Sequence, residues 1–274
     1  MNILVTGANG NTGKYMVKYF SKGHNVIGFD RKELDVCNSE TLLRTIENQN
    51  PDIVIHTAGI SDIDLCERDE TYAYKVNTLG TLNIAKACDY LNIPLVYLST
   101  SYVFNGMKTS PYIEEDYCDP INTFGKTKLA AEKLIRTVCK KHYIIRTSWI
   151  FGGYNCYIKN IIKNDPLIIL STKEIISPTY IEDLCFAIDF IIKQNSYGIF
   201  NCVNGNYSSK IDVISFVLEA SRLNKKVVEI PKEYLSDLTP RPRFSALSTS
   251  LIEKEFKLSL PSWQESIYTY ISLL

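Results

Sequence analysis

The stretch NILVTGANGNTGK, residues 2–14, decides the fold. It opens with a short apolar run that ends at Gly7, which is typical of a buried strand in a parallel sheet. Gly7, Gly10 and Gly13 form a G-x-x-G-x-x-G array, and helical spacing begins at Thr12. Glycine allows a tight turn and close approach of a pyrophosphate, while a helix N-terminus offers free N–H groups to the anion. Glycine spacing alone is weak evidence, but the flanking strand and helix predict a dinucleotide-binding loop rather than a ligand-free turn.

Strand and helix patterns alternate outward from this loop through the first half of the chain. Apolar runs predict strands over residues 2–7, 25–30, 51–59, 93–101 and 142–152. Helical spacing predicts helices over residues 12–21, 39–50, 77–92 and 123–141. Strands separated by helices imply right-handed crossovers and a parallel sheet that is covered on both faces. The fold class predicted is therefore α/β, a Rossmann-like doubly wound parallel sheet.

The pattern loosens after about Gly152. Short strands are expected over residues 165–170, 197–203 and 225–230, and helices over 180–194, 210–224 and 262–274. We interpret this part as a smaller C-terminal α/β substrate lobe that closes one side of a cleft. The predicted division is a cofactor-binding Rossmann domain over residues 1–152 and a mainly substrate-binding lobe over residues 153–274, whose segments interleave if parts return to the sheet.

Composition excludes several classes of protein. Lys plus Arg and Asp plus Glu number 30 each, so no basic field favours nucleic acid as a partner. The eight cysteines form no C-x-x-C pair and lie at no zinc-finger spacing, so we expect no metal site. Most of them stand in apolar stretches, which predicts buried free thiols in a reducing cytosol. The sequence has no 18-residue apolar run, so we expect a cytoplasmic protein without a membrane partner.

The end of the second predicted strand bears on the choice of cofactor. A carboxylate at Asp30 suits the ribose 2′-hydroxyl of NAD. Arg31 or Lys32 suits the 2′-phosphate of NADP. The two signals oppose each other, so we predict that either NADP or NAD binds and do not rank them.

Hydroxyl groups gather where the fourth predicted strand ends, at Ser99, Thr100, Ser101 and Tyr102. The carboxyl end of a parallel strand is the rim of the ligand crevice in such folds, although hydroxyls there also serve simple strand-end hydrogen bonding. On the helix that follows, positions 124 and 128 share a face. A lysine there holds the nicotinamide ribose and lowers the pKa of a neighbouring phenol, which then protonates the substrate oxygen. Lys128 is present, but position 124 is phenylalanine.

Together these residues resemble the extended short-chain dehydrogenases, and in particular the dTDP-4-dehydrorhamnose reductase family. The resemblance runs nearly from end to end. Five elements carry it in the right order: the "STDYVF" stretch at Ser99–Phe104, "N-x-Y-G-x-x-K" at Asn122–Lys128, "RTSW" at Arg146–Trp149, "PTY" at Pro178–Tyr180 and "RP…S-x-L" at Arg241–Leu247.

The resemblance implies an NAD(P)H-dependent reductase that acts on a nucleotide-linked 4-keto-6-deoxysugar in dTDP-rhamnose and polysaccharide biosynthesis. A homodimer is a further expectation. The implied catalytic positions are Thr100, Phe124, Lys128 and Tyr102. Implied substrate contacts are Ser61, Ile63, Ser101, Tyr102, Trp149 and Arg243. The implied cofactor contacts are Gly7, Gly10, Asn11, Thr12, Gly13, Asp30, Arg31, Asp35, Val36, Ala58, Gly59 and Lys128.

Two positions depart from the family pattern. Ser101 replaces an aspartate beside the substrate, so sugar orientation or product stereochemistry is expected to differ. Phe124 replaces the proton-donating tyrosine. Three hypotheses account for it: a Tyr→Phe variant made to trap a complex, a natural enzyme that uses another donor such as Tyr102, or a non-catalytic NAD(P)-binding regulatory protein. The last has an analogue in the methionine adenosyltransferase β-subunit, which resembles the same family.

Overall fold

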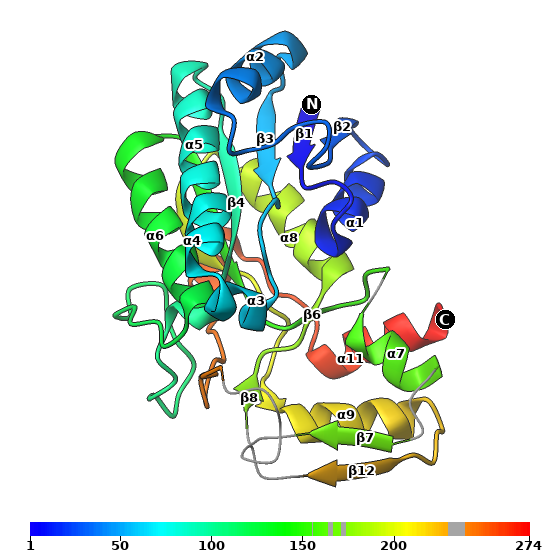
Figure 1. Ribbon diagram of the computed structural model, residues 1–274. Helices are drawn as coiled ribbons and strands as arrows, with labels where there is room; N and C mark the ends of the chain where they lie inside the picture. Colours follow the sequence, from blue (N-terminus) through cyan, green and yellow to red (C-terminus); the bar gives the residue numbers. More distant parts are fainter. Residues whose placement is uncertain (155, 164–166, 171–173, 230–238) are drawn as a thin grey trace.

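A six-stranded parallel sheet forms the centre of the protein in this computed structural model (Figure 1). The structure describes residues 1–154, 156–163, 167–170, 174–229 and 239–274. Strand order is β10-β5-β4-β3-β1-β2, and every neighbouring pair is parallel. The strands are β1 (Asn2–Thr6), β2 (Asn25–Phe29), β3 (Ile53–His56), β4 (Leu95–Thr100), β5 (His142–Thr147) and β10 (Gly198–Asn201). The predicted doubly wound parallel sheet is confirmed.

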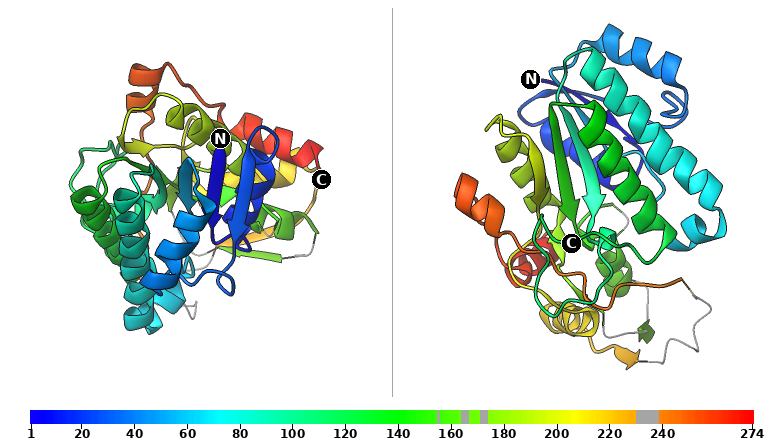
Figure 2. Two further views of the ribbon diagram at one scale, coloured as in Figure 1. Left: turned by 90° about the horizontal axis from the view of Figure 1, so that it is seen from above. Right: turned by 90° about the vertical axis from the view of Figure 1, so that its left-hand side faces the viewer.

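Helices cover both faces of this sheet because successive strand residues point to opposite sides. In β1, Leu4 packs in one buried cluster, while Ile3 and Val5 pack in the other. The right-hand view of Figure 2 shows α5 and α6 on one side of the strands and α8 on the other. The first face carries α2 (Ser39–Gln49), α5 (Thr81–Tyr90) and α6 (Thr123–Val138); the second carries α1 (Asn11–Phe20) and α8 (Ile181–Ile192), which contact each other.

The order of the strands fixes where a ligand can bind. Chain order reverses between β1 and β3, since β2 lies on one side of β1 and β3 on the other. Ligands of open α/β sheets bind at such a switch point, outside the carboxyl ends of the strands. The loops after β1, β3 and β4 all leave the sheet at this edge.

A smaller lobe lies beyond the carboxyl edge, at the bottom of Figure 1. It contains three two-stranded pairings, β6 with β9, β7 with β12 and β8 with β11. Its strands are β6 (Ile150–Phe151), β7 (Leu167–Leu170), β8 (Ile175–Ile176), β9 (Thr179–Tyr180), β11 (Ser208–Ser209) and β12 (Lys226–Glu229). Among the described residues after 152, the helices besides α8 are α7 (Tyr157–Lys163), α9 (Lys210–Ala220), α10 (Ser250–Phe256) and α11 (Trp263–Ser272).

The two lobes interleave along the chain. Strand β10 pairs with β5 in the large sheet, and α8 packs on the face that α1 also covers. These two segments, from residues 153–274, therefore pack with the large sheet. The reason is physical: both are strongly apolar, and the edge of β5 and the open face beside α1 are where they become buried.

The segment between β3 and α5 differs most from the sequence prediction. It forms α3 (Ile63–Arg68), α4 (Glu70–Ala73) and a π-helical turn, η1 (Tyr74–Gly80), where no helix was predicted before residue 77. Asp62 and Asp69 cap α3 and α4 by accepting backbone N–H bonds from Leu65 and Tyr72. Short helices of this kind depend on caps rather than on a long apolar stripe, so periodicity does not reveal them.

All eight cysteines are free thiols, and all but Cys37 and Cys118 are buried. Within the described residues, no helix combines the length and the apolar character that crossing a bilayer requires. Residues 165–166 and 230, at the ends of two predicted strands, lie outside the described residues.

Candidate active site

The glycine loop brings the first strand, the first helix and the third strand into close contact. Gly7 has a φ of +72°, and a Cβ there would lie 2.7 Å from the backbone of Ala58. A Cβ on Gly13 would overlap the carbonyl oxygen of Gly7 and the hydroxyl of Thr57. Gly10 is the N-cap of α1, and its N–H donates to the Gly7 carbonyl at 2.9 Å. The loop therefore needs glycine for its own geometry, and it leaves the start of α1 open to an anion.

A cavity of about 230 Å³ lies beside this loop. It unites eight of the predicted cofactor residues: Gly7, Gly10, Asp30, Arg31, Asp35, Val36, Ala58 and Gly59. Asp30 accepts hydrogen bonds from the Asn9 side chain and from the N–H groups of Lys32 and Glu33. The Arg31 guanidinium lies over the Tyr72 ring, 5.5 Å from its centroid. A carboxylate and a guanidinium thus stand together at this end of the cavity, so both NAD and NADP have a polar partner here.

A second cavity, of about 380 Å³, continues along the carboxyl edge of the sheet. Thr57, Gly59 and Ile60 line both cavities, so the two form one cleft. The second cavity unites these predicted residues: Asn11, Thr12, Gly59, Ser61, Ile63, Thr100, Ser101, Tyr102, Phe124, Lys128 and Trp149. Gly13 lies beneath the loop and supports it rather than lining the cleft.

The start of α6 is fixed tightly against the end of β4. Asn122 caps the helix, since its side-chain oxygen accepts the N–H of Gly125 at 2.8 Å. A side chain on Gly125 would overlap the carbonyl of Tyr102, so glycine allows the helix to approach this closely. The Asn122 amide also donates to the Pro240 carbonyl at 2.8 Å, which ties the late "RP" element to the helix start. These contacts place positions 124 and 128 opposite Thr100.

Lys128 reaches from α6 to the strand. Its ammonium donates to the Leu98 carbonyl at 2.5 Å and lies 4.1 Å from the centroid of the Tyr97 ring. Burial lowers the pKa of Lys128 to about 7, and the negative charge of Glu132 opposes that shift. Its charge therefore responds to small changes around neutral pH.

Phe124 stands where the cleft meets α6. Its ring lines the cavity and makes an edge-to-face contact with Tyr102, with 6.1 Å between the centroids. A phenyl ring at this position fills space and has no proton to donate. Tyr102 lines the same cavity and carries a phenol, while Ser101 is buried at its wall. The Thr100 hydroxyl accepts the N–H of Tyr102 at 3.2 Å and keeps its own proton available for donation.

The sugar side of the cleft contains most, but not all, of the predicted residues. Ser61, Ile63 and Trp149 line it, and Trp149 adopts a φ of +35°. Arg243 is exposed and does not line this cavity, so its role as a phosphate contact stays a prediction. Arg241 pairs with Asp64 across 3.4 Å, next to Ile63.

Several lining residues were not singled out from the sequence: Thr57, Ile60, Leu98, Thr147, Ser148, Ile150 and Ile176. Thr147 is the clearest of them, because its hydroxyl is buried and has no hydrogen-bond partner among the described residues. It pairs in register with Thr100 across β4 and β5. The sequence feature that could have identified Thr147 is its position in "RTSW", at the end of a predicted strand.

Comparison with known proteins agrees with this geometry. The model of the family described as RmlD substrate binding domain matches residues 1–274. The chain is 32 % identical to spore coat polysaccharide biosynthesis protein SpsK of Bacillus subtilis (98 % of this chain, 96 % of that protein). It is 30 % identical to dTDP-4-dehydrorhamnose reductase of Escherichia coli (97 % and 96 %).

The solved structures give the same result at the level of the fold. The dTDP-4-dehydrorhamnose reductase of Bacillus anthracis, in complex with NADP, superposes with a TM-score of 0.95 at 29 % identity, covering 100 % of this chain and 99 % of that one. A UDP-glucose 4-epimerase of Thermus thermophilus shares the fold at 20 % identity, with a TM-score of 0.84, covering 99 % of this chain and 98 % of that one. The family match over the whole chain and a relative at 32 % identity lead to one conclusion. This chain belongs to the RmlD substrate binding domain family.

Proposed function

We propose that this chain is an NAD(P)H-dependent reductase of a nucleotide-linked 4-keto-6-deoxysugar. One observation carries the proposal: the glycine loop, Thr100, Lys128 and the sugar-side residues line a single continuous cleft. The names of the relatives support the same reaction class, since several are dTDP-4-dehydrorhamnose reductases. The route to dTDP-rhamnose and polysaccharide is therefore part of the proposal.

The residues of the cleft have separate roles in the proposed reaction. The glycine loop and the start of α1 hold the pyrophosphate of the cofactor, and Asp30 and Arg31 face its adenosine end. When bound, the nicotinamide supplies the hydride. The Thr100 hydroxyl donates a hydrogen bond to the substrate carbonyl, and Lys128 holds the nicotinamide ribose. We further propose that the substrate diphosphate binds Arg243 and that the sugar lies against Ser61, Ile63 and Trp149.

Phe124 limits the rate of this reaction. The reduced oxygen needs a proton, and a phenol supplies about 10²–10⁴-fold of rate in general acid catalysis. Without that phenol, Tyr102 is the nearest candidate donor, since it lines the same cavity in edge contact with Phe124. We therefore expect slow turnover that depends on Tyr102, together with intact cofactor binding.

The cellular setting belongs to the same proposal. Eight free thiols fit a reducing compartment, so we place the enzyme in the cytoplasm. A homodimer is proposed on the family resemblance alone. NADP is the first cofactor to test, since a relative is known in complex with it.

The test is a paired assay of this chain and Phe124→Tyr. NADH and NADPH oxidation are followed with a dTDP-linked 4-keto-6-deoxyhexulose as substrate. We expect Phe124→Tyr to turn over about 100-fold faster or more, because it restores the acid. Phe186→Tyr is the matched control, since Phe186 is 47 % exposed on α8 and does not line the cleft.

The opposite result has a clear meaning. If both forms bind NADPH and neither oxidises it with the sugar nucleotide, the reductase proposal fails. A non-catalytic NAD(P)-binding regulatory protein would then be the better description. Phe124 is the observation that favours this second candidate, because it removes the acid while the cofactor cleft stays intact.

A further inference from the structure

A buried ion pair lies one helical turn beyond the lysine of the cleft. Glu132 of α6 is 1 % exposed and Arg146 of β5 is 3 % exposed. Arg146 donates through Nη2 and Nε to the two carboxylate oxygens of Glu132, at 2.7 and 3.1 Å. The Ser99 hydroxyl donates to the same carboxylate. With three donors from two strands, the carboxylate has a single orientation.

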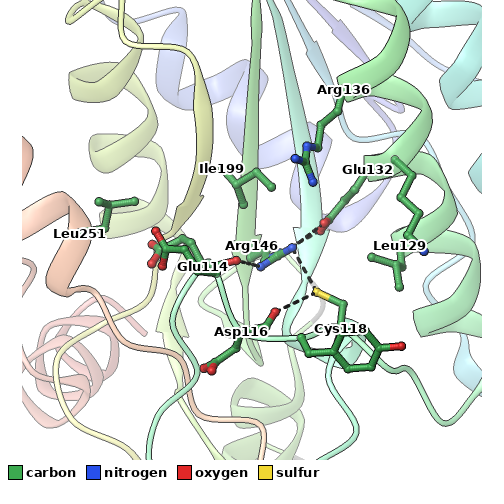
Figure 3. A pocket seen from close by; sticks show the side chains of 12 residues that line it. Glu114, Asp116, Cys118, Leu129, Glu132, Arg136, Arg146, Ile199 and Leu251 are labelled. Carbon is green, nitrogen blue, oxygen red and sulfur yellow. Dashed lines mark hydrogen bonds and ion pairs between the residues drawn. The ribbon is translucent and has the colours of Figure 1, made fainter.

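Arg146 is itself held on its other side (Figure 3). Its Nη1 donates to the Glu114 carbonyl at 3.0 Å, and its Nη2 contacts the Cys118 sulfur at 3.3 Å. The guanidinium also lies 5.2 Å from the centroid of the Phe104 ring. These groups border a separate cavity of about 550 Å³, whose wall Glu132 and Arg146 help to form. The pair thus links the loop between β4 and α6 to the rear of the catalytic cleft.

Glu132 and Lys128 act on neighbouring residues of one strand. They stand four residues apart on α6 and so share a face. Lys128 binds the Leu98 carbonyl, while Glu132 binds the Ser99 hydroxyl. The next residue of β4 is Thr100, and both Ser99 and Thr100 line the cleft. The helix and the strand are therefore joined by two adjacent hydrogen bonds directly before the reactive hydroxyl.

We propose that Glu132, held by Arg146, is a positioning residue for the reduction: through Ser99 it sets the end of β4 against α6 and so fixes Lys128 relative to Thr100. The assignment rests on the proposed function, because it concerns the same cleft. Glu132 does not touch substrate or cofactor in this scheme. It acts through the groups that do.

The electrostatic surroundings of Lys128 give Glu132 a second role. The titratable groups that face the ammonium are Glu132 on its own helix, Cys66 on α3, His56 on β3 and Tyr97 on β4. Burial raises the pKa of Cys66 to about 11, lowers the pKa of His56 to about 3 and raises the pKa of Tyr97 well above its usual value. These three are uncharged at neutral pH, so among the described residues Glu132 is the charged neighbour that keeps Lys128 protonated.

The first test measures NADPH binding against pH with Glu132→Gln. The amide keeps the shape of the side chain and removes its charge. Affinity should fall as Lys128 loses its proton, and Glu132→Gln should move the midpoint of that fall to lower pH by about one pH unit. Glu114→Gln is the matched control, because Glu114 is also buried beside Arg146 but does not face Lys128. An unchanged midpoint in folded Glu132→Gln, or an equal shift in the control, overturns the assignment.

The second test does not disturb the ion pair. Ser99→Ala removes a buried hydroxyl that donates to the Glu132 carboxylate. Ser266→Ala removes a buried hydroxyl that donates to the Asp183 carboxylate. Both are made in the Phe124→Tyr background. We expect Ser99→Ala to lower kcat about tenfold with KM for NADPH unchanged, because the reacting groups are misplaced by a fraction of an ångström. Ser266→Ala should keep kcat. Equal losses in both variants would mean a structural role only and would overturn the proposal.

The two levels of failure are distinguishable. If Phe124→Tyr does not turn over, whether or not the parent chain binds NADPH, the proposed function fails, and this assignment fails with it. If both work but either the midpoint or the Ser99→Ala kcat fails to respond as expected, the reductase stands and Glu132 has no positioning role.

Discussion

The two ends of the cleft recognise their ligands by different means. The glycine-loop end uses backbone: Gly7, Gly10 and Gly13 shape a turn at the start of α1, and a side chain at Gly7 or Gly13 would overlap its neighbours. Free N–H groups at a helix start suit an anion. The α6 end uses single side-chain groups, the hydroxyl of Thr100 and the ammonium of Lys128. At position 124 the phenyl ring lacks the oxygen that a tyrosine would supply. Geometry at the first end excludes a side chain at Gly7 and Gly13, whereas chemistry at the second can change with one atom while the fold stays the same. Binding and catalysis should therefore respond independently to mutation.

Gly13→Ala should break the backbone end most severely. The new Cβ overlaps the Gly7 carbonyl and the Thr57 hydroxyl, so either the loop or α1 must move. We expect unfolding free energy to fall by about 3 kcal/mol, the upper end of the cost of overpacking. NADPH affinity should fall roughly 100-fold. Thermal melting and calorimetry measure both. Gly23→Ala is the control, since a Cβ there meets nothing within 4 Å; equal behaviour of the two variants would contradict the prediction.

Thr100→Val, in the Phe124→Tyr background, should affect only the side-chain end. The substitution keeps the shape and removes the hydroxyl that, in the proposed reaction, donates to the substrate carbonyl. Loss of one such donor costs about 100-fold in kcat, while NADPH affinity should stay within about twofold of the parent. Steady-state kinetics and calorimetry report the two quantities separately. Thr45→Val, at a partly buried threonine of α2 that does not line the cleft, is the control. A matching loss of NADPH binding in Thr100→Val would show that the two ends are coupled.

Arg31→Ala sharpens the comparison within the cofactor end. The guanidinium lies over the Tyr72 ring and lines the cofactor end of the cleft, and we propose that it binds the 2′-phosphate of NADPH. Its removal should weaken NADPH about tenfold, the worth of one charge-assisted contact, and leave NADH unchanged. Lys32→Ala, one residue further and exposed, should change neither Kd. If Arg31→Ala weakens NADH as much as NADPH, the guanidinium does not distinguish the two cofactors. The contact between Asp30 and the ribose hydroxyl would then be the main determinant of cofactor affinity at this end.

Lys128→Met should change how the stability of the protein depends on pH. The folded-state pKa of Lys128 is about 7, below its ordinary value of 10.5, so between these values the unfolded chain binds more protons. Stability of the parent therefore rises with pH above 7, by up to about 1.4 kcal/mol per pH unit from this group alone. The Met variant lacks this contribution.

Urea unfolding at pH 7.0, 7.75 and 8.5 measures the difference between parent and variant. Lys128→Met should be relatively most stable at the lowest pH, with its advantage shrinking as pH rises. Lys126→Met, at an exposed position of the same helix, should follow the parent. Parallel curves for all three proteins would mean that burial does not lower the pKa of Lys128.

Much of the fold was predictable, because local patterns and the burial they serve agree. The five strands of the first half and the glycine loop follow from apolar runs and glycine spacing, and all are found. The short helices α3 and α4 were missed, because aspartate caps rather than a stripe define them. The sequence did not show that α8 and β10 pack with the large sheet, since it gives their apolar character but not the surface that buries it.

The candidate site divides in the same way. Sequence by itself determined which chemical groups are present: the glycines, Thr100, Lys128, and a phenyl ring where an acid was expected. Only the tertiary structure decided which of them share a cavity, that Thr147 joins them with an unpartnered hydroxyl, and that Arg243 lies off the lining. It also placed Glu132, Ser99 and Arg146 together behind Lys128. The physical reason is that spacing along one element fixes which residues share a face, whereas contacts between elements depend on packing across the whole core.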